Sequence, residues 1–302
     1  CNDLPDYMAR IAKGEQNPKV VMVYEANPVY ALPDADTMAQ TFEKIPFKVT
    51  FSSFMDETAE VCDLILPAAM GLERADDIDT PLGMGNYIYA ASKKAVSPPE
   101  GVKQITDVIL GLSKALGADL GFKKFEKLLD AKAKALGGKF KKLAKGKVVT
   151  NNNLVSQTEL VVDLNAVQKA KVEVPGKGEF LLTPVAELNV GSAKLATPGT
   201  NLYTIPADEL YKKDMFVKMN KATAGKLGVK FGDMVKISGA SGEVKARVTL
   251  SEKVMPGVVA APLGFGHTAW DKYSAGKGEN VYKVMSYATE PGAGFTVWSA
   301  SK

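Results

Sequence analysis

The sequence VVMVYEANP occupies residues 20–28, and its first five residues form an apolar run typical of a strand buried on both faces of a sheet. Pro28 ends this strand, because a proline disfavours a helical backbone at the preceding Asn27. A helix over about 34–44 and a second strand at 47–51 follow. The chain therefore begins with a strand–helix–strand pattern.

A third strand is predicted at 63–66, where Pro67 stops it, and one acidic helical turn at 56–60 precedes it. Alternating strands and helices predict a parallel sheet with right-handed crossovers. Ligands of such sheets usually bind at the carboxyl ends of the strands. Asn27 and residues 52–56 fall at those ends, so this part of the chain is where we expect a site.

A lysine-rich segment follows an amphipathic helix predicted at 104–116. Residues 123–147 contain ten Lys, with only Glu126 and Asp130 to oppose them, and also an apolar stripe. The pattern favours a solvated helical insertion, over about 122–147, that packs on its own domain. A partner-docking or membrane-surface helix is the alternative.

The remainder of the chain has the pattern of an all-β domain. Short strands are predicted at 234–238, 244–250 and 258–262, with Gly-containing turns between them, and this spacing suggests a closed barrel. The polar stretch near 151 separates the two patterns. We therefore predict a partial α/β domain over 1–150 and a β-barrel domain over 151–302.

The charge composition argues against nucleic acid as a partner. The chain has 302 residues, 38 of them basic and 34 acidic, for a formal net charge of +4. All the basic residues except Arg10, Arg74 and Arg247 are Lys. Arginine is the residue suited to bidentate contacts with phosphates and base edges, so this excess does not predict nucleic-acid binding.

Cys1, Cys62 and His267 are the only Cys and His residues. Alone they cannot form a Cys/His zinc site or a four-thiolate iron–sulfur cluster. No apolar run approaches the roughly 20 residues of a membrane-spanning helix, and no signal-peptide pattern is present. Because the first residue is Cys, we expect a processed chain or part of a longer one.

Four phrases carry a resemblance to a known family. In order they are YEANPVYALPD (24–34), FSSFMDETAEVCDLILPAAMGLE (51–73), MNKATAGKLGVKFGDMVKISGASGEVKARVTL (219–250) and MPGVVAAPLGFGH (255–267). The chain resembles the carboxyl-terminal half, domains III and IV, of molybdopterin oxidoreductases of the DMSO reductase family. FSSFMDETAE, LERADDIDTP, GFGH and GKGEN are most similar to the branch of polysulfide, thiosulfate and menaquinone reductases.

The resemblance implies a fold and a division of labour. The expected fold is α/β: a parallel-sheet lobe followed by a double-psi-type β-barrel lobe, the molybdopterin dinucleotide-binding domain. In the family, the iron–sulfur cysteines and the molybdenum ligand lie in the amino-terminal half. This chain would therefore hold molybdopterin guanine dinucleotide without supplying catalytic or metal-ligating residues.

The resemblance also implies which side chains would contact the cofactor. Pterin and guanine present donor and acceptor edges that Asp, Asn and backbone groups can bind. The candidates are Asn27, Asp56, Glu57, Thr58, Asp63, Asn189, Gly191, Ser192, Asn220, His267 and Asn280. Each has a structural alternative: Asp56 and Asn220 can cap helices, Asp63 can stay solvated at a strand start, and His267 can be a loop histidine.

We expect the chain to be the cofactor-embracing part of an oxidoreductase subunit. That subunit would belong to a membrane-associated respiratory complex for anaerobic electron transport. Its partners would be the amino-terminal half, on the same or a separate chain, an iron–sulfur subunit and a quinone-reactive membrane subunit. The location would be the periplasmic face of the bacterial cytoplasmic membrane, with no transmembrane segment of its own. The alternative is the same fold without molybdenum, a scaffold linking the iron–sulfur and quinone-reactive subunits, which the scarcity of Arg slightly favours.

Overall fold

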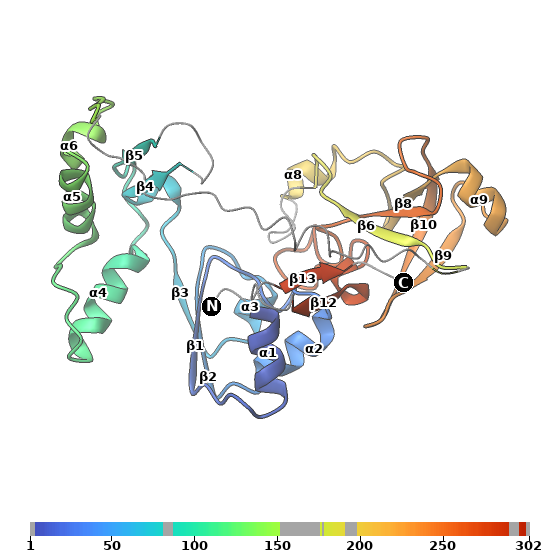
Figure 1. Cartoon of the computed structure of the whole chain (residues 1–302), viewed down its shortest axis with the longest axis horizontal. Coiled ribbons are helices and arrows are strands. Elements are labelled where there is room, and N and C mark those ends of the chain that lie inside the picture. Colours follow the sequence, from blue (N-terminus) through green and yellow to red (C-terminus); the bar gives the residue numbers. More distant parts are fainter. Residues whose placement is uncertain are drawn as a thin grey trace, which may run out of the picture. The chain divides into compact units, whose positions relative to one another are not determined.

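The computed structural model describes residues 4–80, 87–151, 176, 178–190, 198–289 and 296–299 (Figure 1). The chain divides into two compact units by its internal contacts. Unit 1 combines Cys1–Ile65 with Val172–Lys302, and unit 2 is Leu66–Lys171. The division into domains at about residue 151 stays a prediction, because 152–175 lie outside the described residues.

The amino-terminal part of unit 1 has the predicted alternation of strands and helices. Its elements are α1 (Leu4–Ala12), β1 (Val20–Tyr24), α2 (Ala35–Glu43), β2 (Phe47–Ser52), α3 (Glu57–Glu60) and β3 (Leu64–Pro67, which runs into unit 2). The strands form a sheet in the order β1-β2-β3, and β1 pairs with β2 in parallel, Val20 opposite Phe47. The parallel α/β sheet is confirmed.

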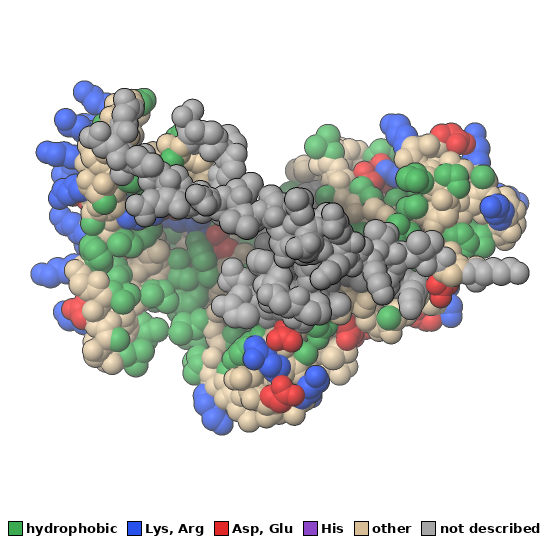
Figure 2. Space-filling model, viewed as in Figure 1, with side chains coloured by type: hydrophobic (Ala, Val, Ile, Leu, Met, Phe, Trp, Pro, Cys, Tyr) green, Lys and Arg blue, Asp and Glu red, His purple; other side chains and the backbone are tan. Residues whose placement is uncertain are grey.

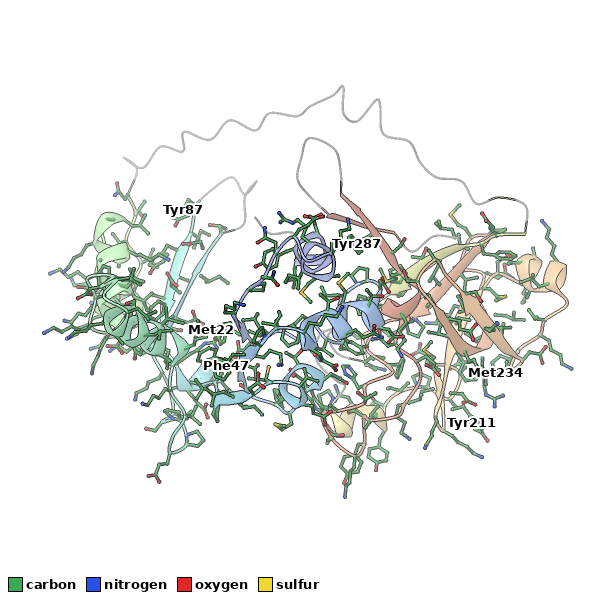
Figure 3. All side chains as sticks on the ribbon, turned by 90° about the horizontal axis from the view of Figure 1, so that it is seen from below. Met22, Phe47, Tyr87, Tyr211, Met234 and Tyr287 are labelled. Carbon is green, nitrogen blue, oxygen red and sulfur yellow. The ribbon has the colours of Figure 1, made fainter. Side chains whose placement is uncertain are left out.

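The prediction that β1 is buried on both faces is wrong. Val23 is buried with Met8, Met38 and Phe42 from α1 and α2, whereas Met22 on the opposite face is 49% exposed. The cause is the position of the strand: β1 lies at the edge of the sheet, and both helices that pack on it contribute to the same core. Figure 3 labels Met22 and Phe47, which are both exposed.

The carboxyl-terminal part of unit 1 is built on a mixed sheet. Its elements are β6 (Leu181–Val185), α8 (Gly199–Leu202), β7 (Leu210–Tyr211), β8 (Asp214–Met219), α9 (Lys221–Leu227), β9 (Met234–Ser238), β10 (Glu243–Leu250), β11 (Val258–Pro262), η2 (Val281–Val284), β12 (Ser286–Thr289) and β13 (Thr296–Ser299). The strand order is β6-β11-β8-β10-β9, with β7 beside β8. The mixed sheet and the parallel sheet together confirm the α/β class.

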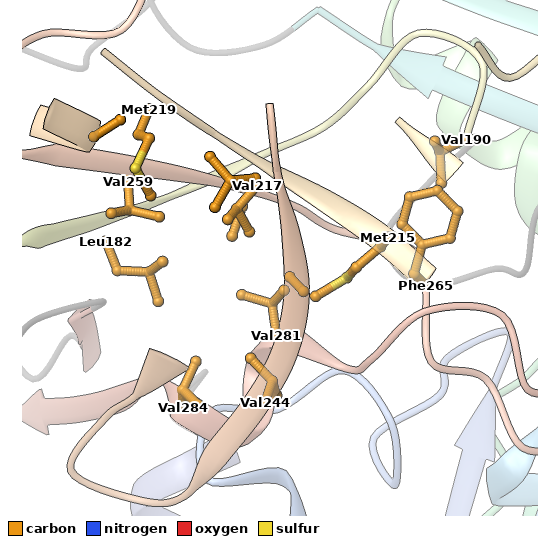
Figure 4. Close-up of a cluster of buried hydrophobic side chains, with 14 residues drawn as sticks. Leu182, Val190, Met215, Val217, Met219, Val244, Val259, Phe265, Val281 and Val284 are labelled. Atoms are coloured by element: carbon orange, nitrogen blue, oxygen red, sulfur yellow. The ribbon is translucent and has the colours of Figure 1, made fainter. Parts of the chain in front are cut away.

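Sequence signals explain the local structure of this sheet. Asn220 caps α9 by accepting a hydrogen bond from the backbone N–H of Ala222 at 2.9 Å, and Gly228 ends the helix in the left-handed conformation. On β10, Val244, Ala246 and Val248 alternate inward and are buried. Burial of each Val contributes roughly 1.5–3 kcal/mol. These side chains belong to the barrel core of Figure 4.

The described residues of unit 2 form short strands, one 3-10 helix and three α-helices. Its elements are η1 (Gly71–Glu73), β4 (Asp76–Asp79), β5 (Tyr89–Ser92), α4 (Ile105–Ala115), α5 (Phe125–Ala135) and α6 (Phe140–Leu143). β4 and β5 pair antiparallel. A small core contains Ala75, Leu129, Ala133 and Phe140, all at most 3% exposed. The lysine-rich segment therefore packs on unit 2.

Candidate functional site

The candidate site lies within unit 1, where the sheet of β1–β3 meets the loop that follows β11. Three segments supply it: the end of β1 with Asn27, the start of α3 with Glu57, and the loop with His267. Asp56 positions Glu57, because its carboxylate caps α3 by accepting a hydrogen bond from the backbone N–H of Ala59 at 2.8 Å.

Glu57 is the centre of the site. Its carboxylate accepts hydrogen bonds from Asn27 Nδ2 at 2.7 Å and from the backbone N–H groups of Thr268 at 2.8 Å and Ala269 at 3.2 Å. His267 Nδ1 lies 3.0 Å from Glu57 Oε1. Four donors from two distant segments therefore converge on one buried carboxylate.

Asn27 and Thr58 extend this network on the side of the sheet. Asn27 Oδ1 accepts hydrogen bonds from the Thr58 backbone N–H at 3.2 Å and from Thr58 Oγ1 at 2.8 Å. Thr58 Oγ1 in turn accepts from the backbone N–H of Val29 at 3.2 Å. Asn27 and Thr58 are 2% and 0% exposed, so their polar atoms are satisfied by protein and not by solvent.

Tyr30 covers the other side of His267. The two rings stack with their centroids 3.8 Å apart, and the Tyr30 hydroxyl donates to the backbone oxygen of Phe265 at 2.8 Å. Asn280 completes the arrangement, because its Nδ2 donates to the Tyr30 backbone oxygen at 2.9 Å and its Oδ1 accepts from the Tyr282 N–H at 3.0 Å. Asn280 therefore fixes Tyr30 from the side of the barrel.

The electrostatics keep Glu57 ionised. Burial raises the pKa of the Glu57 carboxyl, but the hydrogen bonds and charge of His267 and the hydrogen bond from Asn27 outweigh it and lower the pKa to about 2. An ionised carboxylate only accepts hydrogen bonds, so Nδ1 of the His267 ring is the donor in this contact. At neutral pH Glu57 has no proton to donate.

Asp56 differs from its neighbour. Burial raises the pKa of the Asp56 carboxyl, and the hydrogen bond from the Ala59 N–H only partly opposes this effect. The same side chain is 2% exposed. Its geometry is that of a helix cap, which was one of the two roles predicted for it.

Two glycines allow close packing beside the site, Gly266 against Asn280 and Gly278 against Phe265. Gly266 has a φ of +77°, and a Cβ atom added there would lie 2.1 Å from the backbone nitrogen of Asn280. Gly278, with a φ of +65°, would place a Cβ 2.7 Å from Cβ of Phe265. Only glycine fits these positions, so the GFGH and GKGEN phrases have a packing role beside the site.

The other predicted residues lie apart from this network. The Asp63 carboxylate accepts from the Lys48 backbone N–H at 2.7 Å and pairs with its ammonium group at 3.1 Å. Asn220 caps α9 and donates to the Val254 backbone oxygen at 3.0 Å, while Asn189 donates to the Thr204 backbone oxygen at 3.3 Å. Gly191 and Ser192 lie outside the described residues.

Sequence reasoning missed Tyr30 and the aromatic contact next to it. Tyr30 stands within the phrase YEANPVYALPD, three residues after Asn27, but a tyrosine between two prolines carries no specific signal. The ring of Trp270 stacks on that of Phe54, with the centroids 4.3 Å apart. The backbone of Trp270 has a φ of +90°, and its backbone N–H donates to the Met55 backbone oxygen at 2.8 Å.

Several of the predicted cofactor contacts are engaged in hydrogen bonds within the protein. The polar atoms of Asn27, Glu57 and Thr58 are engaged with one another and with the loop. The guanidinium groups suited to phosphates are each ion-paired, in the pairs Arg10–Asp6, Arg74–Asp76 and Arg247–Asp214. The role of the predicted residues as cofactor contacts stays a prediction.

One buried atom of the site is left without a partner. His267 is 1% exposed, and its Nε2 makes no hydrogen bond to any described residue. Among the described residues, no cluster of three or more His, Cys, Asp or Glu side chains is arranged to hold a metal ion. None of the helices formed by the described residues is long and apolar enough to cross a bilayer.

Two family models match the chain. The molybdopterin oxidoreductase model matches residues 5–115, and the molydopterin dinucleotide binding domain model matches residues 189–296. The solved structure of acetylene hydratase from Pelobacter acetylenicus superimposes with a TM-score of 0.74 at 16% identity, over 97% of this chain and 45% of that one. This likeness concerns the fold alone.

Several curated relatives are similar over most of the chain, and two of them are described here. The menaquinone reductase, molybdopterin-binding-like subunit of Nitratidesulfovibrio vulgaris is 44% identical over 301 residues, which are 99% of this chain and 43% of the relative. The F420-dependent formate dehydrogenase subunit alpha of Methanocaldococcus jannaschii is 23% identical, over 84% of this chain and 40% of the relative. The chain thus spans about two fifths of the length of these relatives.

Proposed function

Because this chain belongs to the molybdopterin oxidoreductase family, we propose that it is the carboxyl-terminal frame of a subunit in a respiratory electron-transfer complex. Both curated relatives are named as subunits, and one of them as part of a menaquinone reductase. The proposed complex lies at the periplasmic face of the cytoplasmic membrane. Its other members are an iron–sulfur subunit and a quinone-reactive membrane subunit.

The network around Glu57 is the observation that carries this proposal. Some of the residues that the family resemblance assigns to the cofactor, among them Asn27, Glu57 and His267, here join the α/β sheet to the loop after β11. A buried, ionised carboxylate with four donors holds both parts in one arrangement, because separating them would leave the charge without partners. The geometry thus favours a scaffold that presents fixed surfaces to partner subunits.

The chemistry of the network agrees with a structural role. Glu57 cannot act as a general acid near neutral pH, because its pKa is about 2. Burial also raises the pKa of the Tyr30 hydroxyl well above its ordinary value, so this group keeps its proton. Glu57 and Tyr30 therefore keep fixed protonation states near neutral pH, which agrees with a role in positioning chain segments.

A frame that also embraces molybdopterin guanine dinucleotide is the second candidate. The unpartnered Nε2 of His267 favours it, because a buried imidazole nitrogen normally has a hydrogen-bond partner, which a ligand could supply. The match of the dinucleotide-binding model over 189–296 supports it as well. In this candidate the iron–sulfur clusters and the metal ligand belong to the amino-terminal half or to a partner chain.

Elemental analysis of the native assembly separates the two candidates. Molybdenum and tungsten are measured by mass spectrometry, iron serves as the internal reference for the electron-transfer subunits, and released pterin is measured by fluorescence. Iron in the absence of molybdenum, tungsten and pterin supports the scaffold. Molybdenum or tungsten with pterin, in stoichiometric amounts, rejects the scaffold and supports the cofactor-embracing subunit. Isolation of the chain without any partner subunit would contradict both.

A further inference from the structure

A strongly basic surface of unit 2 has no role in the function proposed above. We define the lysine face as the eight exposed lysines of α5, α6 and their flanks that form no ion pair with a described residue: Lys123, Lys124, Lys127, Lys139, Lys141, Lys142, Lys145 and Lys147. Figure 2 shows Lys and Arg side chains gathered along the edge of the molecule where Figure 1 places α5 and α6. This segment lies between the two family matches, which end at 115 and resume at 189.

Packing fixes the direction of this face. Leu129 and Ala133 are fully buried on one side of α5, together with Phe140 of α6. At 100° per residue, Lys127 lies on the opposite side of α5 from these two residues. The apolar stripe is therefore already used within unit 2, and the lysines are left for solvent or for a partner.

Among the described residues of unit 2, carboxylates form ion pairs with two lysines of the segment 123–147. Lys132 pairs with Asp77 and Asp79 of β4, and Lys134 pairs with Asp130. No carboxylate of the described residues lies within 4.0 Å of an ammonium group of the lysine face. Unopposed like charges repel one another, so this surface gains from contact with negative charge.

We propose that the lysine face docks on an anionic phospholipid surface. Lysine carries a compact, strongly hydrated charge, and residues 123–147 contain no Arg. Protein interfaces are enriched in Arg and depleted in Lys, whereas polybasic clusters bind anionic lipid head groups without specific geometry. A surface made only of lysines thus fits a membrane better than an acidic protein.

The expected attraction is additive and sensitive to salt. A Lys near an anionic bilayer contributes about 1 kcal/mol, which is a factor of about five in partitioning. The attraction falls off over the Debye length of about 10 Å at 0.1 M salt. Several lysines acting together therefore suffice for reversible binding without an inserted helix.

Vesicle sedimentation with the full chain tests the proposal. The vesicles contain equimolar phosphatidylglycerol and phosphatidylcholine, and pure phosphatidylcholine vesicles serve as the reference. We expect the chain to sediment only with the anionic vesicles, and to be released as salt rises from about 50 mM to about 500 mM. Substitution of Lys127, Lys139, Lys141 and Lys142 by Gln should lower the partition coefficient by roughly a hundredfold or more.

A matched variant controls for net charge. Lys226, Lys230, Lys245 and Lys253 of unit 1 are exposed and have no ion pair, so their replacement by Gln removes the same charge elsewhere. This variant should bind anionic vesicles nearly as well as the wild type. Equal loss in both variants, or no sedimentation of the wild type with anionic vesicles, would overturn the proposal. Circular dichroism confirms that each variant is folded, and no outcome depends on metal, pterin or electron transfer.

Discussion

The Glu57 carboxylate and the His267 ring are 210 positions apart in the chain and lie in hydrogen-bond contact, with Oε1 3.0 Å from Nδ1. The contact joins the start of α3 to the loop after β11. Both side chains are buried, at 8% and 1% exposure. Unit 1 therefore depends on a polar link as well as on its apolar cores.

Glu57→Gln should destabilise unit 1 by about 3 kcal/mol or more. The amide group of Gln would turn a donor toward the donors of Asn27, His267 and the loop, and would remove the charge that they surround. Urea unfolding followed by circular dichroism measures the change. Glu60→Gln is the control, because Glu60 lies exposed on the same helix and should change stability by less than about 0.5 kcal/mol. Similar effects of the two substitutions would contradict the assigned role of Glu57.

The same carboxylate predicts how stability depends on pH. Its folded-state pKa of about 2 lies below the ordinary value of 4.5, so its contribution is complete above pH 4.5 and is lost as pH falls toward 2. The full contribution is about 3 kcal/mol, of which about 2 kcal/mol should be lost between pH 7 and pH 3. The raised pKa of the Asp56 carboxyl has the opposite effect, because it makes the folded state more stable as the pH falls.

This pH dependence is measured as the difference in unfolding free energy between the wild type and Glu57→Gln. Because other titrating groups contribute to both proteins, the difference isolates Glu57. It should shrink as the pH is lowered from 7 to 3. A difference that stays constant over this range would show that the folded-state pKa of Glu57 is not lowered.

Gly266→Ala should prevent the loop from packing beside the site. The added Cβ would lie 2.1 Å from the backbone nitrogen of Asn280, and neither backbone can give way easily. Gly276→Ala is the matched control, since Gly276 has a similar φ of +68° but open space around it. Gly276→Ala should lower the free energy of unfolding by about 1–2 kcal/mol through backbone strain alone. Gly266→Ala should lower it clearly more. Equal unfolding midpoints for the two variants would exclude the close approach.

Local sequence signals were sufficient for much of the secondary structure. The apolar run at 20–24 forms β1, and Asn220 caps a helix, α9, which was one of the roles predicted for it. These elements follow from residues that are neighbours in the chain. The burial of β1 did not follow, because the cover of a strand depends on distant helices, which leave Met22 exposed.

The candidate site was predictable only in part. Asn27, Glu57, Thr58, His267 and Asn280 were selected as polar candidates through the family resemblance, and the structure brings them together. Their partners could not be predicted, because the contacts join segments more than 200 residues apart. A polar side chain in a sequence has the same signal whether it binds a ligand or another segment of the chain.

Leu129→Ala should unfold unit 2 locally while unit 1 stays folded. Leu129 is fully buried in the small core with Ala75, Ala133 and Phe140, so its truncation leaves a cavity and costs about 2–5 kcal/mol. That core shares no residue with the cores of unit 1. Hydrogen exchange measured by mass spectrometry should therefore show faster exchange in the described segments of 66–151 and unchanged protection in β8 and β10. Leu116→Ala, at a position 74% exposed, should alter neither unit; loss of protection in both units after Leu129→Ala would mean that they unfold as one.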